Sequence, residues 1–263
     1  MESYDTIAKE LSDYVRQYTD LIVTYDEDGW NSTPKKPKGL GSVTLVSFRE
    51  KKYLITCRHV ITHKRWFFSG AGKGTGQTIN EKEALKCRSL KIVSESTDCD
   101  IAILSGYPDN PLTRKLFYPI EEFRALSYSK LCKECGTLCV SVGGLAKITE
   151  FMSWPDLLYA NICYIEAQSS ILSVTEDEIT VDFGSNEVFD KRTDLFPKLK
   201  DFNPENGVID MHGCSGCGLW GFIEKTPCLI GILRGRIEDN PDNCHIIRFT
   251  PVWKVLEILN SIT

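Results

Sequence analysis

Short apolar runs separated by turn-forming residues recur along the chain between residues 20 and 250. Runs of this length, rich in β-branched and aromatic residues, predict strands, and their spacing favours an antiparallel all-β architecture over alternating strands and helices. We expect a turn near residues 49–52 and a loop over 26–39. The expected strands are residues 21–25, 42–46, 53–56, 90–93, 101–104, 138–142, 162–167, 179–183, 228–233 and 246–249.

Helical periodicity marks both ends of the chain. Apolar residues recur every three or four positions over residues 3–19, which predicts an amphipathic helix. Residues 251–262 carry a second apolar stripe, and Pro251 is acceptable in the first turn of a helix. The pattern therefore predicts β-structure flanked by an N-terminal and a C-terminal helix.

Charge and composition narrow the classes of function. The 263 residues carry a net charge of −5, which argues against nucleic acid as the principal partner, because phosphate binding needs clustered Lys and Arg. The first twenty residues are highly charged and no stretch is apolar enough for a membrane span, so we expect a cytoplasmic protein with no membrane partner. The eleven cysteines are then expected as reduced thiols, with Cys57, Cys99 and Cys163 acting as small core residues in strands.

Three short patterns suggest chemistry, and they follow one another in a fixed order. An apolar strand runs directly into His59 within residues 54–61. Asp100 precedes the apolar run 101–104, and Ser215 lies in a glycine-rich turn that leads into another strand. A serine hydroxyl needs a base to become nucleophilic, a histidine is suited to that role, and an acid orients the histidine ring. Glycines around the serine allow backbone N–H groups to converge on a developing oxyanion.

These segments resemble the motifs of the trypsin-like, chymotrypsin-fold serine proteases. The matching segments are T-C-R-H-V at 56–60, D-I-A-I-L at 100–104 and G-C-S-G at 213–216. The resemblance covers roughly residues 20–262 and is nearest to the catalytic domains of intracellular, HtrA-type enzymes without a PDZ domain. It implies two antiparallel six-stranded β-barrels with the site in the cleft between them.

The resemblance also implies a domain division and a role for each site residue. The divisions would be an N-terminal helical extension, a first barrel and a second barrel, over residues 1–20, 21–125 and 126–263. His59 would be the general base, Asp100 its orienting partner and Ser215 the nucleophile. The N–H groups of Gly213 and Ser215 would form the oxyanion hole of a peptidase that needs no cofactor and no metal.

The substrate-binding residues are less narrowly defined. By the same resemblance, Ile209 would form the floor of the S1 pocket and favour an apolar residue, whereas one inserted residue would place Asp210 there and favour Lys or Arg. Arg234, Gly235 and Arg236 would lie on the strand at the edge of the cleft, where the arginines either select acidic substrate residues or are simply exposed.

Two alternatives concern the chemistry of the same segments. Asp98 could take the place of Asp100, although Asp100 directly adjoins the apolar strand. Cys217 stands where the family has a second glycine, and a side chain is unfavourable there if the position needs a positive φ. A protease-like binding module without activity is therefore a second hypothesis.

A third hypothesis is a zinc-binding module, because the chain has two C-x-x-C pairs and further ligands nearby. The candidate ligands are Cys132, Cys135, Cys139, His212, Cys214 and Cys217. The expected partners of the peptidase are a protein or peptide substrate and a regulatory protein, as in a bacterial stress or defence system.

Overall fold

The computed structural model describes the greater part of both predicted halves of the chain. The described residues are 10–11, 13–25, 27–32, 39–61, 65–69, 77–80, 90–107, 116–120, 131, 138–144, 150–154, 157–161, 164–182, 213–223, 226–236 and 246–262.

The first half forms a seven-stranded sheet with the order β4-β1-β2-β3-β7-β6, and β8 pairs in parallel with β2 off this path. Its other neighbouring strands are antiparallel. Its strands are β1 (Thr19–Tyr25), β2 (Gly39–Phe48), β3 (Lys51–Cys57), β4 (Arg65–Ser69), β6 (Lys91–Ser96), β7 (Ile101–Ser105) and β8 (Tyr118–Pro119).

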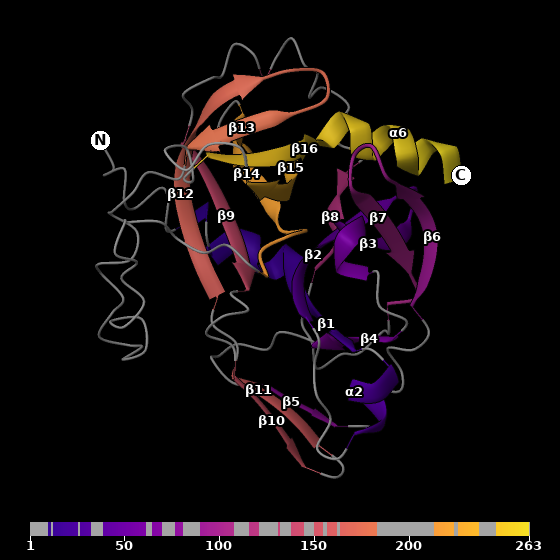
Figure 1. Cartoon of the computed structure of the whole chain (residues 1–263). Coiled ribbons are helices and arrows are strands. Elements are labelled where there is room, and N and C mark those ends of the chain that lie inside the picture. Colours follow the sequence, from indigo (N-terminus) through magenta and orange to yellow (C-terminus); the bar gives the residue numbers. More distant parts are fainter. Residues whose placement is uncertain are drawn as a thin grey trace, which may run out of the picture.

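The second half is a closed six-stranded barrel with the order β12-β13-β16-β15-β14-β9, and Figure 1 shows it beside the first sheet. Its strands are β9 (Leu138–Gly144), β12 (Tyr164–Val174), β13 (Ile179–Asp182), β14 (Gly218–Ile223), β15 (Thr226–Arg236) and β16 (Ile246–Pro251). A smaller sheet pairs β10 (Glu150–Trp154), β11 (Leu157–Asn161) and β5 (Gln77–Asn80).

Helices lie at both ends of this β-structure. Residues 13–15 are helical and continue into the 3-10 helix η1 (Arg16–Tyr18). The C-terminal helix α6 (Val252–Ile262) contacts β6 of the first sheet as well as β15 and β16 of the barrel (Figure 1). It therefore bridges the two halves.

A continuous apolar core joins the two halves. In β7, Ile101 and Ile103 belong to this shared core, whereas Ala102 and Leu104 belong to a second cluster on the other face of the first sheet. Successive strand residues point to opposite faces, so an apolar run without alternation indicates a strand that is covered on both sides. Tyr118 also links the two halves, because its hydroxyl donates a hydrogen bond to the carbonyl of Pro227 in β15 over 3.2 Å.

The prediction of an all-β fold built from two β-units, with a helix at each end, is confirmed. One difference is in the first sheet, which has seven strands in place of six and does not close along its path within the described residues. The predicted division into domains stays a proposal. None of the helices within the described ranges is both long and apolar enough to cross a membrane.

Several local predictions were wrong. The expected loop at 26–39 contains the short helix α2 (Glu27–Asn31). Pro251 does not begin the last helix but ends β16, where it pairs with Gly231, because a proline at a strand end need not donate to the ladder. Cys99 lies in a turn rather than a strand. The strands β4, β5, β8, β10 and β11 were not predicted.

Candidate active site

His59 is placed by the abrupt end of a buried strand. Residues 53–57 of β3 are buried, and the chain then turns at once into the 3-10 helix η2 (Arg58–Ile61). Val60 and Ile61 are buried under this turn, while the imidazole of His59 is 51% exposed. The apolar residues on either side anchor the turn, and the ring is left at the surface where it can meet a substrate.

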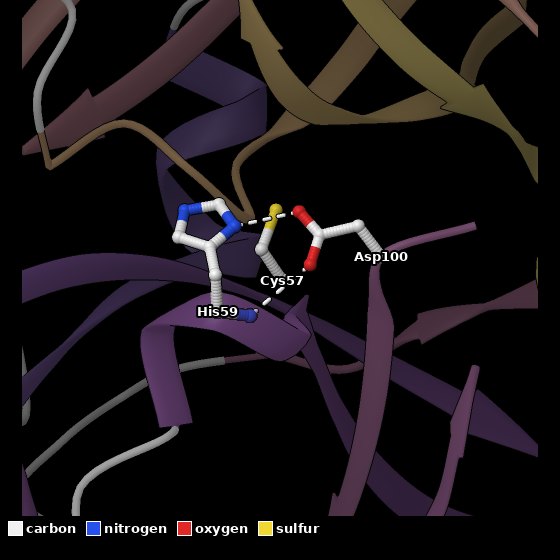
Figure 2. A group of neighbouring side chains, drawn as sticks. All are labelled: Cys57, His59 and Asp100. Atoms are coloured by element: carbon white, nitrogen blue, oxygen red, sulfur yellow. Dashed lines mark hydrogen bonds and ion pairs between the residues drawn. The ribbon is translucent and has the colours of Figure 1, made fainter. Parts of the chain in front are cut away.

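Asp100 holds this turn through three hydrogen bonds. Its carbonyl accepts from the amide of Arg58 over 3.0 Å, and its Oδ1 accepts from the amide of His59 over 3.1 Å. Its Oδ2 lies 2.6 Å from Nδ1 of the His59 ring (Figure 2). Asp100 reaches this position with a φ of 51°, a left-handed conformation that aspartate tolerates better than most residues.

The electrostatics of the pair define the position of the proton. Burial raises the pKa of Asp100, but the hydrogen bonds from His59 and the positive charges of His59 and Arg234 outweigh it, so the pKa lies below its ordinary value. An ionised carboxylate only accepts hydrogen bonds, so Nδ1 of His59 is the donor. The other ring nitrogen, Nε2, points away from Asp100 (Figure 2) and is the atom that can accept a proton.

This lowered pKa predicts a pH dependence of stability. Above roughly pH 4, the ordinary range of aspartate, Asp100 is ionised in the folded and unfolded states, and its stabilising contribution is complete. As the pH falls through the lower pKa of the folded state, that contribution is lost. We expect the free energy of unfolding, measured by urea titration, to fall more steeply below roughly pH 4 in the wild type than in Asp100→Asn. An equal slope in both proteins would contradict the assignment.

Ser215 lies in a tight loop that leads into β14. Gly213 has a φ of 96° and Gly216 a φ of 94°, conformations that side-chain-bearing residues rarely adopt. The hydroxyl of Ser42 donates to the carbonyl of Gly213 over 2.9 Å, and the hydroxyl of Thr44 donates to that of Gly216 over 3.0 Å. Two side chains of β2 therefore hold the loop from the other half of the molecule.

Gly216 brings the loop against the strand that ends at His59. A Cβ atom added to Gly216 would lie 2.2 Å from the carbonyl oxygen of Ser42 and 2.5 Å from the hydroxyl oxygen of Thr56. The amide of Gly216 donates to the carbonyl of Leu233 over 3.0 Å, and that carbonyl also accepts from the thiol of Cys57. The absence of a side chain at Gly216 thus permits the close approach of the two segments.

The loop directs its carbonyl groups inward and leaves two amides available. The carbonyl of Ser215 accepts from the amide of Ser42 over 2.9 Å. Within the described ranges, no acceptor pairs with the amides of Gly213 or Ser215. Ser215 is partly exposed, and its hydroxyl makes no hydrogen bond to any described residue, His59 included. The amides of Gly213 and Ser215 and the hydroxyl of Ser215 therefore have no partner among the described residues.

Cys217 stands where the family has a glycine, and its backbone conformation is one that residues with a side chain adopt. Its φ is not positive, so the positions that require a left-handed backbone are Gly213 and Gly216, on either side of the Cys214–Ser215 pair. Cys217 is fully buried, and burial raises the pKa of its thiol to about 12. Its side chain is part of the apolar core.

None of the buried thiols near the site is suited to act as a nucleophile. Cys57, Cys214 and Cys217 are 0% exposed, and burial also raises the pKa of Cys57 well above its ordinary value. Over the described ranges, no cluster of three metal-binding side chains includes Cys214 or Cys217. Cys132, Cys135 and His212 lie outside the described residues, so the structure offers no support for the zinc-binding module.

Comparison with known proteins bears on the fold. No protein-family model and no curated protein sequence matches the chain. Among solved structures, the active form of the Rv3671c protease from M. tuberculosis matches 99% of this chain and 87% of its own, with a TM-score of 0.54 and 14% sequence identity. The fold is chymotrypsin-like. At this identity the likeness concerns the fold, and a site must be argued from its own residues.

In this chymotrypsin-like fold the candidate site draws on both halves. His59 and Asp100 come from the first sheet, and Ser215 comes from the loop before β14 of the barrel. The structure brings His59 and Asp100 into hydrogen-bond contact, whereas Asp98 is exposed and does not share in these bonds. The Ser215 loop packs against the end of β3 through Gly216.

Three of the five predicted substrate-binding residues lie within the described part of the chain. Ile209 and Asp210 lie outside the described residues. Arg234 is partly exposed, and its charge helps to lower the pKa of Asp100, so it lies close to the site. Gly235 is partly exposed, and a Cβ atom there would meet no atom within 4 Å. The backbone of Arg236 pairs with Ile247 across β15 and β16.

Two residues of the site were missed from the sequence. Ser42 and Thr44 are 0% exposed and hold the Ser215 loop, yet they alternate with the apolar Val43 and Leu45. Such alternation is typical of a strand with one solvent-exposed face. The alternation correctly indicated two different faces of β2. The polar face, however, is not exposed to solvent, because the Ser215 loop covers it.

Proposed function

We propose that the chain is a serine endopeptidase that hydrolyses peptide bonds through an acyl-enzyme. The observation that carries this proposal is the 2.6 Å contact between His59 Nδ1 and Asp100 Oδ2, next to a loop that presents Ser215 between two glycines of positive φ. The chymotrypsin-like fold supports this chemistry by analogy, because the solved structure that shares the fold is a protease.

In the proposed reaction Ser215 Oγ attacks the carbonyl carbon of the peptide bond. Nε2 of His59 removes the hydroxyl proton, and Asp100 stabilises the imidazolium through Nδ1–H. The negative carbonyl oxygen of the tetrahedral intermediate accepts hydrogen bonds from the amides of Gly213 and Ser215. The imidazolium then protonates the departing amine, and a water molecule, activated by the same ring, hydrolyses the ester on Ser215.

The apo geometry is compatible with this cycle. The Ser215 hydroxyl is not hydrogen-bonded to His59, but catalytic hydrogen bonds are often long without substrate and tighten in the Michaelis complex. The imidazole is half exposed, so a small reorientation of the ring toward Ser215 that keeps Nδ1 on Asp100 need not displace core residues.

A fluorophosphonate probe tests the proposal, because it phosphonylates only a serine that a base activates. We expect stoichiometric labelling of the wild type, mapped to Ser215 by peptide mass spectrometry, and no labelling of Ser215→Ala. The missing Ser215–His59 hydrogen bond favours a second candidate function, a binding module of the same fold without activity. Complete failure to label the folded wild type would support that second function.

The finer predictions from the sequence belong to the same proposal. They are the kinship to HtrA-type catalytic domains, the cytoplasmic location, the division into three segments, the narrow protein or peptide substrate and the control by a protein partner. Control by a partner implies that the purified chain alone degrades casein slowly. Broad and rapid cleavage of casein would end that part of the proposal.

A further inference from the structure

The thiol of Cys57 has no role in the proposed reaction, yet it lies against both residues of the base. Its sulfur, a ring nitrogen of His59 and a carboxylate oxygen of Asp100 lie within 4.8 Å of one another, and Nδ1 is the ring nitrogen that contacts Asp100 (Figure 2). Across the described ranges, this is the one group of three or more histidine, cysteine and carboxylate side chains that is compact enough for a metal ion.

Strand pairing and hydrogen bonds fix the positions of the three residues that carry the ligand atoms. Cys57 is the last residue of β3 and pairs with Ile101, so Asp100 lies next to it in the turn immediately before β7. The amide of His59 is fixed on Oδ1 of Asp100, and the thiol of Cys57 donates to the carbonyl of Leu233 over 2.8 Å. A set of donors fixed in this way loses little conformational freedom on binding an ion.

The chemistry of the donors selects the class of ion. Thiolate and imidazole together favour zinc and similar transition metals over calcium and magnesium, which prefer oxygen ligands. Tetrahedral zinc has bonds of about 2.3 Å to sulfur and about 2.0 Å to nitrogen, which places its ligand atoms about 3.5 Å apart. The present separations allow this with small side-chain rotations, and the half-exposed imidazole leaves an entry path.

We propose that Cys57, His59 and Asp100 form an inhibitory site for Zn²⁺, with Sγ, Nδ1 and one carboxylate oxygen as ligands and water in the fourth position. The thiol of Cys57 gives up its proton to solvent, because a coordinated thiol is deprotonated even where burial disfavours the free thiolate. Its hydrogen bond to Leu233 is replaced by the Zn–S bond. The ring proton of His59 leaves Nδ1 and is carried on Nε2, so one proton is released in total.

Regulation by this site rests on the proposed function. Nε2 is the atom that must accept the proton of Ser215, and in the zinc-bound form it already carries one. The ion therefore removes the base without contact with Ser215. Chelation of the ion restores the original tautomer and, with it, the activity.

The experiment measures binding and inhibition separately on the full chain. Co²⁺ is titrated first, because thiolate coordination gives a near-ultraviolet charge-transfer band, and Zn²⁺ is then added to displace it. The rate of fluorophosphonate labelling at Ser215 is measured over the same Zn²⁺ range. The variants are Cys57→Ser, Cys57→Ala and, as a matched control outside the cluster, Cys99→Ser, whose thiol is half-buried in the turn before Asp100.

We expect one thiolate-coordinated Co²⁺ per wild-type chain, and slower labelling of Ser215 with the same Zn²⁺ midpoint. Both Cys57 variants should lose the band and need at least about tenfold more Zn²⁺ for inhibition, whereas Cys99→Ser should behave like the wild type. X-ray absorption of the zinc-loaded wild type, which needs no variant, should show one sulfur among nitrogen and oxygen neighbours.

Other outcomes overturn one proposal or the other. A band that persists in Cys57→Ser, or several sulfur neighbours around zinc, would assign the ion to other cysteines and end the proposed site. Binding that depends on Cys57 but leaves the labelling rate unchanged would end the regulation. If the wild type bound Co²⁺ through Cys57 but Ser215 was never labelled, the result would support the metal site and contradict the proposed peptidase activity.

Discussion

Replacement of Asp100 by asparagine is expected to lower kcat/KM by about 10⁴-fold, or about 5.5 kcal/mol of transition-state stabilisation. An asparagine can keep its oxygen on the amide of His59, as Asp100 Oδ1 does at 3.1 Å. Its NH₂ group then faces Nδ1 in place of Oδ2. Two donors cannot face each other, so the ring must hold its proton on Nε2 and cannot accept one from Ser215.

Asp98→Asn is the matched control, because it makes the same chemical change two residues away on an exposed side chain. We expect its kcat/KM to stay within about twofold of the wild type, consistent with the small effects of surface substitutions. Steady-state kinetics on a peptide substrate, with circular dichroism to verify folding, measures both variants. Equal losses in the two variants would show that Asp100 does not orient His59.

Gly216→Ala is expected to cost about 3 kcal/mol or more of stability, which for a chain of this size lowers Tm by about 6–12 °C. The new methyl group would lie 2.2 Å from the Ser42 carbonyl oxygen and 2.9 Å from Cα of Thr56, both backbone atoms that cannot move aside cheaply. The φ of 94° adds backbone strain for any residue with a Cβ. Activity should fall with stability, because relief of the clash pushes the Ser215 loop away from β3.

Gly235→Ala provides the control, since a methyl group there meets no atom within 4 Å and the backbone is not in the left-handed region. Thermal unfolding should place this variant within about 2 °C of the wild type. If Gly216→Ala unfolded at the same temperature as Gly235→Ala, the close packing of the loop on β3 would be wrong.

Local signals explain why much of the β-structure could be predicted. The unbroken apolar run of residues 101–104 and the apolar run before His59 both became buried strands, because each sequence supplies enough apolar surface for two covered faces. The short strand β8 and the pairing of β5 with β11 had no comparable signal. Strand partners far apart in the sequence depend on packing rather than on any local pattern.

The sequence by itself determined the candidate chemistry. His59 after a buried strand, Asp100 before another and Ser215 between glycines are local features, and each gave a specific expectation before any contact was known. The positive φ values at Gly213 and Gly216 correspond to residues that the chain had already made glycine.

Only the tertiary structure decided which groups support that chemistry. The alternation around Ser42 and Thr44 defined two faces of β2, but not that the polar face is buried under the Ser215 loop. Cys57 looked like an ordinary core residue until β3 and β7 brought its sulfur beside His59 and Asp100. The physical reason is that a period of two distinguishes the sides of a strand, whereas what covers each side depends on segments more than a hundred residues away.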